Sequence, residues 1–575
     1  LIYGADIKDE DTELTIDNFT ALVDPQSWEE FMPRGVTKQK FNTFKKYYDP
    51  EIFSAAGKRI RAMARAADKL TVEERIARIA SIFYTFRNPD KETVLTPWKV
   101  VNRHMGDCLG GFCFYDEDYS EPIDEPRYID HGEVTADVFS TDSCLLEINS
   151  KSGLYPLYLA YNIYRTRLKD EMFSPETLEE HQAIWDKAVS ENIFVICKTP
   201  MAKSITRRTL MGFRQARTNM WAPEDLINKI KNQPELFVKK VHDLVGKEMK
   251  IKAIVGNPPY QVMDGGAGVS AKPVYNLFVD VAKNMNPSYI SMIMPSRWFA
   301  GGKGLDSFRE SMLSDKRISH IFDYINAKDC FPTASIGGGI NYILWDEKYN
   351  GQCNITTIQG NKHDKELRSL DQFTVFIRYN SAIHIVKKCQ SKESFASIVN
   401  TRNPFGLTSN LRGRKSGDLR LFSSDGISWL PKSAVSSSNH LLLKYKILMS
   451  KVTAEHAGEP DKNGQFKIIS RTEIINPYDV CTDSYLIVGA SENKAIVENA
   501  YKYLYTRFAR FLLMLSVSSI NLSPDKFQFV PLQNFTSNSD IDWNKSIAEI
   551  EAQLYTKYGL TKEEITFIES RIKPM

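Results

Sequence analysis

The chain has 575 residues, too many for a single hydrophobic core, which predicts two to four domains. Hydrophobic residues make up 42% and charged residues 25% of the sequence, as in ordinary globular proteins. The net charge of +3 neither requires nor excludes nucleic acid, because a basic groove can lie within a nearly neutral chain. The longest apolar runs, such as residues 511–515, fall far short of the ~20 residues that span a bilayer, so we expect no membrane segment.

The eight cysteines are scattered, with no Cys-x-x-Cys pair. This pattern predicts free thiols in a reducing cytosol and no metal site. The N-terminal residues turn acidic at once, which predicts no signal peptide. Because the first residue is Leu, we expect a processed or truncated piece of a longer protein.

Residues 36–90 are predicted to be helical. Thr71 caps a segment that extends to residue 86, and Glu74 stands three positions after it, as in a capping box. We take residues 1–92 as an N-terminal helical region.

Short apolar strands then alternate with helical segments, which predicts an α/β domain over residues 93–350 with a mostly parallel sheet and helices on both faces. Ligands bind such sheets at the carboxyl ends of the strands. We predict a short apolar strand, a polar turn and an apolar helix over residues 143–165, and further short apolar strands within residues 192–198, 250–260, 288–299, 318–325 and 340–347.

Residues 351–575 are richer in Ser, Thr and Asn and alternate less regularly, so they are predicted to form a second, α+β domain. Helical spacing over 493–516, and two helices broken at Gly559, predict a helical end to this domain.

The sequence Asn-Pro-Pro-Tyr, residues 257–260, follows one of the predicted strands. The Asn257 amide oxygen and a backbone carbonyl held by Pro258 and Pro259 can both accept hydrogen bonds from one amino group, which aims the amine lone pair at an electrophile. Tyr260 offers a ring for stacking a planar heterocycle, worth ~1–3 kcal/mol per base. The corner therefore suits group transfer onto such an amine. The alternative is a strand-ending Pro-Pro turn without chemistry.

These residues resemble the catalytic motif of S-adenosylmethionine-dependent amino-methyltransferases. The order of motifs is similar to that of gamma-class adenine-N6 DNA methyltransferases of large single-chain restriction–modification systems: a Thr-Pro motif at Thr96 and Pro97, a cofactor motif at 147–153, the Asn-Pro-Pro-Tyr motif, then a target recognition domain. The resemblance implies a Rossmann-like catalytic domain and a bacterial, cytoplasmic, nucleoid-associated protein. It also implies cofactor binding by Thr96, Pro97, Glu147, Asn149, Ser152 and Gly153.

The cofactor motif departs from the family pattern in two places. Lys151 replaces the first glycine, so that only Gly153 remains. Cys197 stands where the second strand usually ends in an acid that binds the ribose hydroxyls. We therefore expect a different ribose partner or weak cofactor binding.

A basic cluster in the second domain is the candidate DNA contact. If the domain reads DNA, these side chains would bind phosphates or guanine edges; the alternative is a solvated charged face. The cluster contains Arg402, Arg412, Arg414 and Lys415, with Arg420 nearby.

The predicted function is methyl transfer from S-adenosylmethionine to the N6 amino group of an adenine flipped out of duplex DNA, as the modification component of a restriction–modification system. The alternatives are a DNA-binding specificity module with weakened catalysis, or an RNA or protein amino-methyltransferase with the same corner. The sequence shows no helicase phosphate loop, and Gln465 replaces the acid that a common nuclease motif requires. Any nuclease or helicase module is thus expected on a missing N-terminal part or on another chain.

Overall fold

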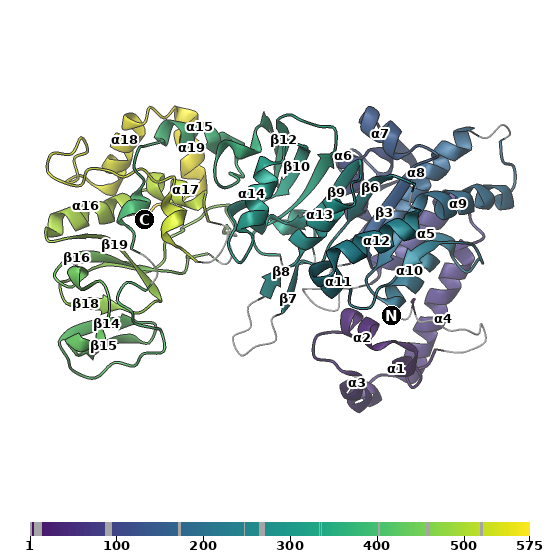
Figure 1. Ribbon diagram of the computed structural model, residues 1–575, viewed down its shortest axis with the longest axis horizontal. Coiled ribbons are helices and arrows are strands. Elements are labelled where there is room, and N and C mark those ends of the chain that lie inside the picture. Colours follow the sequence, from purple (N-terminus) through teal and green to yellow (C-terminus); the bar gives the residue numbers. More distant parts are fainter. Residues whose placement is uncertain are drawn as a thin grey trace.

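The structure is a computed structural model that describes residues 3–4, 14–86, 95–170, 174–246, 248–263, 271–332, 334, 336–400, 403–455, 460–517 and 521–575 (Figure 1). The elongated molecule has two parts. One is a lobe with a large central sheet, and the other, which we call the C-terminal unit, is formed by the chain after residue 368. No helix among the described residues has the length and apolar character needed to cross a membrane.

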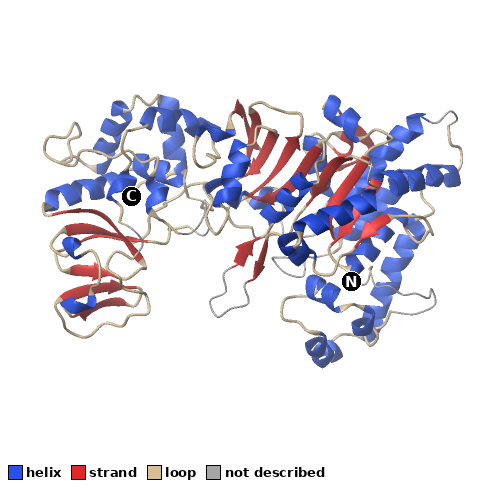
Figure 2. Cartoon of the chain, in the orientation of Figure 1, coloured by secondary structure: helices blue, strands red, loops and turns tan. Residues whose placement is uncertain are grey.

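The central sheet has nine strands in the order β13-β12-β10-β11-β9-β6-β3-β4-β5 (Figure 2). Strands β5, β4, β3, β6 and β9 are parallel neighbours, whereas β11 is antiparallel to both β9 and β10. The predicted mostly parallel sheet is confirmed. The strands are β3 (Cys144–Ser150), β4 (Ile193–Cys197), β5 (Asn219–Trp221), β6 (Ile251–Gly256), β9 (Tyr289–Pro295), β10 (Ile318–Tyr324), β11 (Ile340–Asp346), β12 (Cys353–Gln359) and β13 (Lys362–Arg368).

Helices cover both faces of the sheet, as predicted. Because side chains alternate along a strand, Leu145 and Val255 pack in the core on one face, whereas Leu146 and Ile254 pack in the core on the other. The first face is covered by α5 (Val72–Tyr84), α6 (Trp98–Cys108), α8 (Leu154–Asp170), α9 (Leu178–Asn192) and α10 (Pro200–Met211), and the second by α11 (Leu226–Asn232), α12 (Pro234–Val245), α13 (Tyr275–Asn284) and α14 (Asp306–Ser314).

Smaller elements surround this sheet. Strands β1 (Gly111–Tyr115) and β2 (Pro122–Ile129) form a hairpin before α7 (Glu133–Val138), and β7 (Gln261–Met263) and β8 (Ala271–Pro273) form another directly after the Asn-Pro-Pro-Tyr corner. The 3-10 turns are η1 (Lys45–Tyr47), η2 (Ser296–Ala300), η3 (Ala327–Asp329), η4 (Leu370–Gln372), η5 (Phe395–Ile398), η6 (Lys432–Ala434), η7 (Asn439–Leu441) and η8 (Pro524–Phe527).

The N-terminal region is helical, as predicted, and the Thr71–Glu74 capping box is present. Its side chains belong to the same buried cluster as the first face of the sheet, so this region shares a core with the lobe that contains the central sheet. The predicted boundary between residues 92 and 93 lies outside the described residues. The remaining N-terminal helices are α1 (Phe19–Leu22), α2 (Pro25–Phe31), α3 (Lys38–Phe44) and α4 (Pro50–Ala67).

The predicted boundary at residue 350 is too early, since β12 and β13 continue the central sheet to Arg368. Strand β13 is polar and largely exposed, as an edge strand can be, and its sequence therefore lacks the apolar signal of a buried strand.

The C-terminal unit is α+β, as predicted, and has two cores. The helical segment at 493–516 is divided at Thr506, which caps the second helix. The elements are α15 (Asn380–Cys389), β14 (Leu419–Ser423), β15 (Gly426–Leu430), β16 (Tyr445–Ser450), β17 (Thr472–Ile475), β18 (Asp479–Cys481), β19 (Tyr485–Ser491), α16 (Lys494–Tyr505), α17 (Arg507–Met514), α18 (Ile547–Lys557) and α19 (Lys562–Arg571).

Candidate active site at the carboxyl edge of the sheet

The chain changes direction across the sheet between β3 and β6. From β3 it proceeds outward to β4 and β5, then returns to β6 on the other side of β3. Crevices at such switch points, beyond the carboxyl ends of the strands, are the usual ligand sites of α/β sheets. The turn at 147–153 and the Asn-Pro-Pro-Tyr corner both lie at this point.

Asn257 is held by two residues from distant parts of the chain. Its Nδ2 donates to Thr96 Oγ1 at 3.0 Å, and its backbone carbonyl accepts from Asn149 Nδ2 at 2.7 Å. Gly256 permits this arrangement, because a Cβ at that position would lie 2.6 Å from the Ile148 carbonyl oxygen. The structure thus brings the Thr-Pro, cofactor and catalytic motifs together.

The Asn257 amide oxygen is buried and accepts no hydrogen bond from any described residue. Leaving a buried acceptor unpaired costs about 1–3 kcal/mol, so such an atom points to a ligand that donates to it. With Nδ2 committed to Thr96, the amide is oriented so that its oxygen remains available to a donor.

The rest of the corner fits a planar partner. Pro258 is buried, and Pro259 and Tyr260 are half-buried. Burial raises the pKa of the Tyr260 hydroxyl well above its usual range, so this side chain is a neutral phenol at ordinary pH. It therefore offers the corner a ring and no charge.

Thr96 is buried, whereas Pro97 is exposed and precedes α6 as its N-cap residue. Pro97 makes no side-chain capping bond. The Thr-Pro motif is thus the start of a helix, and Thr96 is in addition the hydrogen-bond acceptor that fixes Asn257.

His104 lies further along the same helix and was not singled out from the sequence. Its buried ring contacts the Tyr155 hydroxyl through Nδ1 and the Ser291 hydroxyl through Nε2, each at 2.8 Å. Burial lowers the pKa of His104 to about 3, so the ring stays neutral and ties α6 to α8 and β9. A lone histidine in a helix gives no local signal of this role.

Glu147 and Asn149 carry two more buried oxygens without a partner among the described residues, Oε2 and Oδ1 respectively. Burial raises the pKa of Glu147 to about 8. Asn149 has φ +75°, the left-handed conformation that Asn tolerates better than most residues. Unpaired acceptors of this kind fit the ammonium and hydroxyl groups of S-adenosylmethionine.

The remaining residues of the turn are engaged by helices. The Ser152 carbonyl accepts from Thr209 Oγ1 at 2.7 Å. Lys151, the departure from the family pattern, forms a 2.6 Å ion pair with Glu30 on α2. Gly153, with φ +76°, packs against Thr206 on α10.

We expect Gly153→Ala to destabilise the protein by about 1–3 kcal/mol, because it combines a strained φ with a Cβ placed 2.9 Å from the Thr206 Cα. Urea unfolding measures the change. Gly132→Ala is the matched control, since Gly132 has φ +63° but no atom within 4 Å of an added Cβ. Equal losses in the two variants would exclude the steric contribution.

Cys197 lies at the end of β4, where the resemblance implies an acid that binds the ribose. A different ribose partner or weak cofactor binding stays a prediction. Cys197 is fully buried and its thiol pKa is raised by burial. The next residue, Lys198, is half-buried, and burial lowers the pKa of its amine. Glu30 and Asp225 lie close enough to Lys198 to oppose this shift, so the acids near this position come from other elements.

Only some side chains of the basic cluster in the C-terminal unit are exposed and able to contact DNA. Arg412, Arg414 and Lys415 are exposed, although Arg412 also pairs with Asp425 at 3.0 Å. Arg420 is held by Asp479 in a two-point ion pair at 2.9 and 2.7 Å, which indicates a structural role. The predicted contact Arg402 lies outside the described residues.

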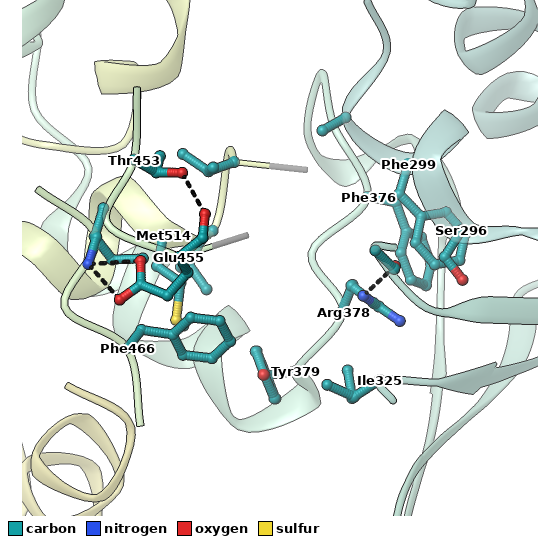
Figure 3. Close-up of a pocket in the computed structure, with 15 residues that line it drawn as sticks. Ser296, Phe299, Ile325, Phe376, Arg378, Tyr379, Thr453, Glu455, Phe466 and Met514 are labelled. Atoms are coloured by element: carbon teal, nitrogen blue, oxygen red, sulfur yellow. Dashed lines mark hydrogen bonds between the residues drawn. The ribbon is translucent and has the colours of Figure 1, made fainter. Parts of the chain in front are cut away.

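A pocket lies between the carboxyl edge of the sheet and the C-terminal unit (Figure 3). Arg378 lies on its sheet side and donates to the Gly338 carbonyl at 2.8 Å and to both oxygens of buried Asp323 at 2.6 and 2.7 Å. Gly339 permits this, because a Cβ there would lie 2.3 Å from the Arg378 guanidinium. Gly339 thus allows the Arg378–Asp323 ion pair on the sheet side of the pocket.

One part of the chain matches a known protein family. Residues 191–331 match the family model described as Eco57I restriction-modification methylase. The resemblance is confirmed for this segment. The matched segment includes β4, β6, β9 and the Asn-Pro-Pro-Tyr corner, whereas Thr96 and residues 147–153 precede it.

Over 112 residues the chain is 37% identical to a protein of Mycoplasma pneumoniae described as an uncharacterized adenine-specific methylase. The match covers 19% of this chain and 26% of that protein, so the chain spans about a quarter of that relative's length. A solved DrdV–DNA complex is similar with a TM-score of 0.44, 10% identity and coverage of 94% of this chain and 63% of that chain. The type IIL restriction–modification enzyme MmeI with DNA is similar with a TM-score of 0.43, 10% identity and coverage of 74% and 72%.

Proposed function

We propose that this protein transfers a methyl group from S-adenosylmethionine to the N6 amino group of an adenine flipped out of duplex DNA, as the modification component of a restriction–modification system. The observation that carries the proposal is the buried, unpartnered Asn257 amide oxygen at the switch point of the sheet. The family match of residues 191–331 supports the same reaction class.

The corner acts by positioning. Asn257 Oδ1 and the Pro258 carbonyl accept the two N–H bonds of the amino group, and Tyr260 stacks on the adenine ring. When both N–H bonds are held in this way, the nitrogen lone pair leaves conjugation with the ring and points out of the ring plane. In the proposed complex it would be directed toward the methyl donor beside residues 147–153. Groups fixed before the reaction need no reorganisation during it.

The cofactor would be held by the unpartnered oxygens of Glu147 and Asn149, beside Thr96. When bound, it would supply an electrophilic methyl group; the amino nitrogen held at the corner would form the new N–C bond as the methyl–sulfur bond breaks, and would release one proton to solvent. Asn149 also bonds to the Asn257 carbonyl at 2.7 Å, so one residue connects the donor side of the site to the acceptor side.

The test is transfer of tritiated methyl from S-adenosylmethionine to duplex DNA, followed by identification of the labelled nucleoside. The proposal expects label in N6-methyladenine. Label in RNA or protein would favour the other amino-methyltransferases. Binding of DNA without any transfer would instead identify a specificity module that has lost catalysis.

Thr96→Val should lower the turnover number about tenfold, because it removes the acceptor that orients the Asn257 amide, a bond worth about 0.5–1.5 kcal/mol. Thr96→Ser keeps the hydroxyl and should retain most of the activity. Single-turnover methylation at saturating DNA measures both variants. A loss in Thr96→Ser, which lacks the methyl group that Val keeps, together with full activity in Thr96→Val would indicate that methyl packing and not the hydrogen bond is the cause.

A further inference from the structure

One segment of the N-terminal region, which contains α3, η1 and α4, is strongly basic. Residues 34–65 contain nine basic residues and two acidic ones, although the whole chain has a net charge of only +3. We call the exposed side chains of α3, η1 and α4 the basic helical surface. It includes Lys40, Lys46, Lys58 and Arg59.

Large side chains are exposed within the same surface. Tyr47 is 79%, Tyr48 53% and Ile52 68% exposed, and the Lys46 amine lies 5.1 Å from the centre of the Tyr47 ring. Tyrosines mixed with lysines and arginines are typical of surfaces that contact the nucleic-acid backbone. The tyrosine hydroxyl can donate to a phosphate oxygen while the ring packs against the sugar.

Three contacts attach α2 to the carboxyl edge of the sheet. Glu30 pairs with Lys151 in the cofactor turn at 2.6 Å. Gln26 Nε2 donates to the Lys198 carbonyl at 3.1 Å, and Ser27 Oγ accepts from the Met201 backbone at 3.1 Å. The N-terminal helices are therefore fixed at the same edge as the Asn257 corner.

The arrangement of elements agrees with these contacts. In Figure 1, α1, α2 and α3 lie on the lower side of the view, where the hairpin β7–β8 extends directly from the corner. The C-terminal unit lies across that hairpin from them. A duplex bound at the corner would therefore have the C-terminal unit on one flank and the N-terminal helices on the other.

We propose that the basic helical surface binds the phosphate backbone of duplex DNA on the flank of the target base opposite the C-terminal unit. This inference rests on the proposed function. Lysine and arginine contacts to phosphate add affinity and fix the register of the protein, but they carry no sequence information. The surface thus lengthens the DNA contact without changing the recognition sequence.

The experiment compares two triple variants of the full chain. Lys40→Gln/Lys46→Gln/Arg59→Gln neutralises the surface, and Lys387→Gln/Lys545→Gln/Lys562→Gln removes the same charge from exposed positions on or beside α15, α18 and α19. Binding to duplexes is measured over a range of salt concentrations. Each lost phosphate contact should reduce the slope of log binding constant against log salt concentration by about 0.9 in magnitude. The slope of the first variant should therefore be smaller by about 2–3, and the slope of the control should be unchanged.

Lengthening the duplex on one flank should increase the DNA affinity of the wild type and of the control but not of the surface variant. In methylation assays the surface variant should show a raised KM for DNA and an unchanged turnover number. An unchanged salt slope in the surface variant, or an equal loss in the control, would overturn the inference. So would wild-type binding to anionic phospholipid vesicles that the surface variant loses while its DNA binding persists. Absence of methyl transfer by the wild type would refute the proposed function alone, because the salt slope is measured without catalysis.

Discussion

Asn257→Ala should abolish methyl transfer, with a loss of at least 10²–10³ in turnover, while binding of DNA and cofactor persists. The variant removes a buried side-chain oxygen that has no partner among the described residues and that the proposed function pairs with the target amine. Deleting a single preorganised group that acts on developing charge typically costs this much. The reaction is followed by single-turnover transfer of tritiated methyl to duplex DNA.

Two controls make this result specific. Asn354→Ala changes the same residue type at an exposed position of β12 and should retain full activity. DNA affinity of Asn257→Ala, measured by anisotropy, should remain close to that of the wild type. Retention of substantial transfer by Asn257→Ala would contradict the assigned role, whereas a joint loss of DNA binding and transfer would indicate damage to the fold.

Glu147→Gln should stabilise the free protein at neutral pH and weaken cofactor binding. The Glu147 pKa is about 8 in the folded protein, compared with about 4.3 in an unfolded chain. Between these values the folded state binds more protons, so the free energy of unfolding falls as the pH rises, by at most about 1.4 kcal/mol per pH unit. Gln has no proton to lose and removes this cost, worth about 2–4 kcal/mol at pH 7.

Urea unfolding of both proteins at pH 5, 7 and 8.5 measures the stability effect, which should be small at pH 5 and largest at pH 8.5. S-adenosylmethionine should raise the melting temperature of the wild type much more than that of Glu147→Gln, because the cofactor ammonium favours the ionised carboxylate. A stability difference that does not vary with pH would contradict the raised pKa of Glu147 in the folded protein. Equal melting shifts would remove Glu147 from the cofactor site.

The corner itself could be predicted from the sequence because its chemistry is local. Pro258 and Pro259 after an apolar run mark the end of a strand, and Asn257 with Tyr260 at that end motivates the proposed function. The parallel sheet was predictable for the same reason, since β4, β6 and β9 are continuous apolar segments.

What the sequence could not supply are the long-range partners. Glu30 lies on a separate helix far from Lys151 along the chain, and no local pattern connects them. The same holds for His104 and Ser291. Asn149 was assigned to the cofactor from its motif alone, and its bond to the Asn257 carbonyl spans 108 residues of sequence.

That separation has a consequence for synthesis of the protein. Ribosomes add about 5–20 residues per second, so β3 emerges several seconds before β6 can pair with it. During that interval the edge of β3 that pairs with β6 in the finished sheet has no partner, although every residue of β3 is buried in the folded protein. Open apolar strand edges are prone to misassociation. The switch point that creates the site thus also leaves a strand edge open during synthesis, where a chaperone would protect the nascent chain.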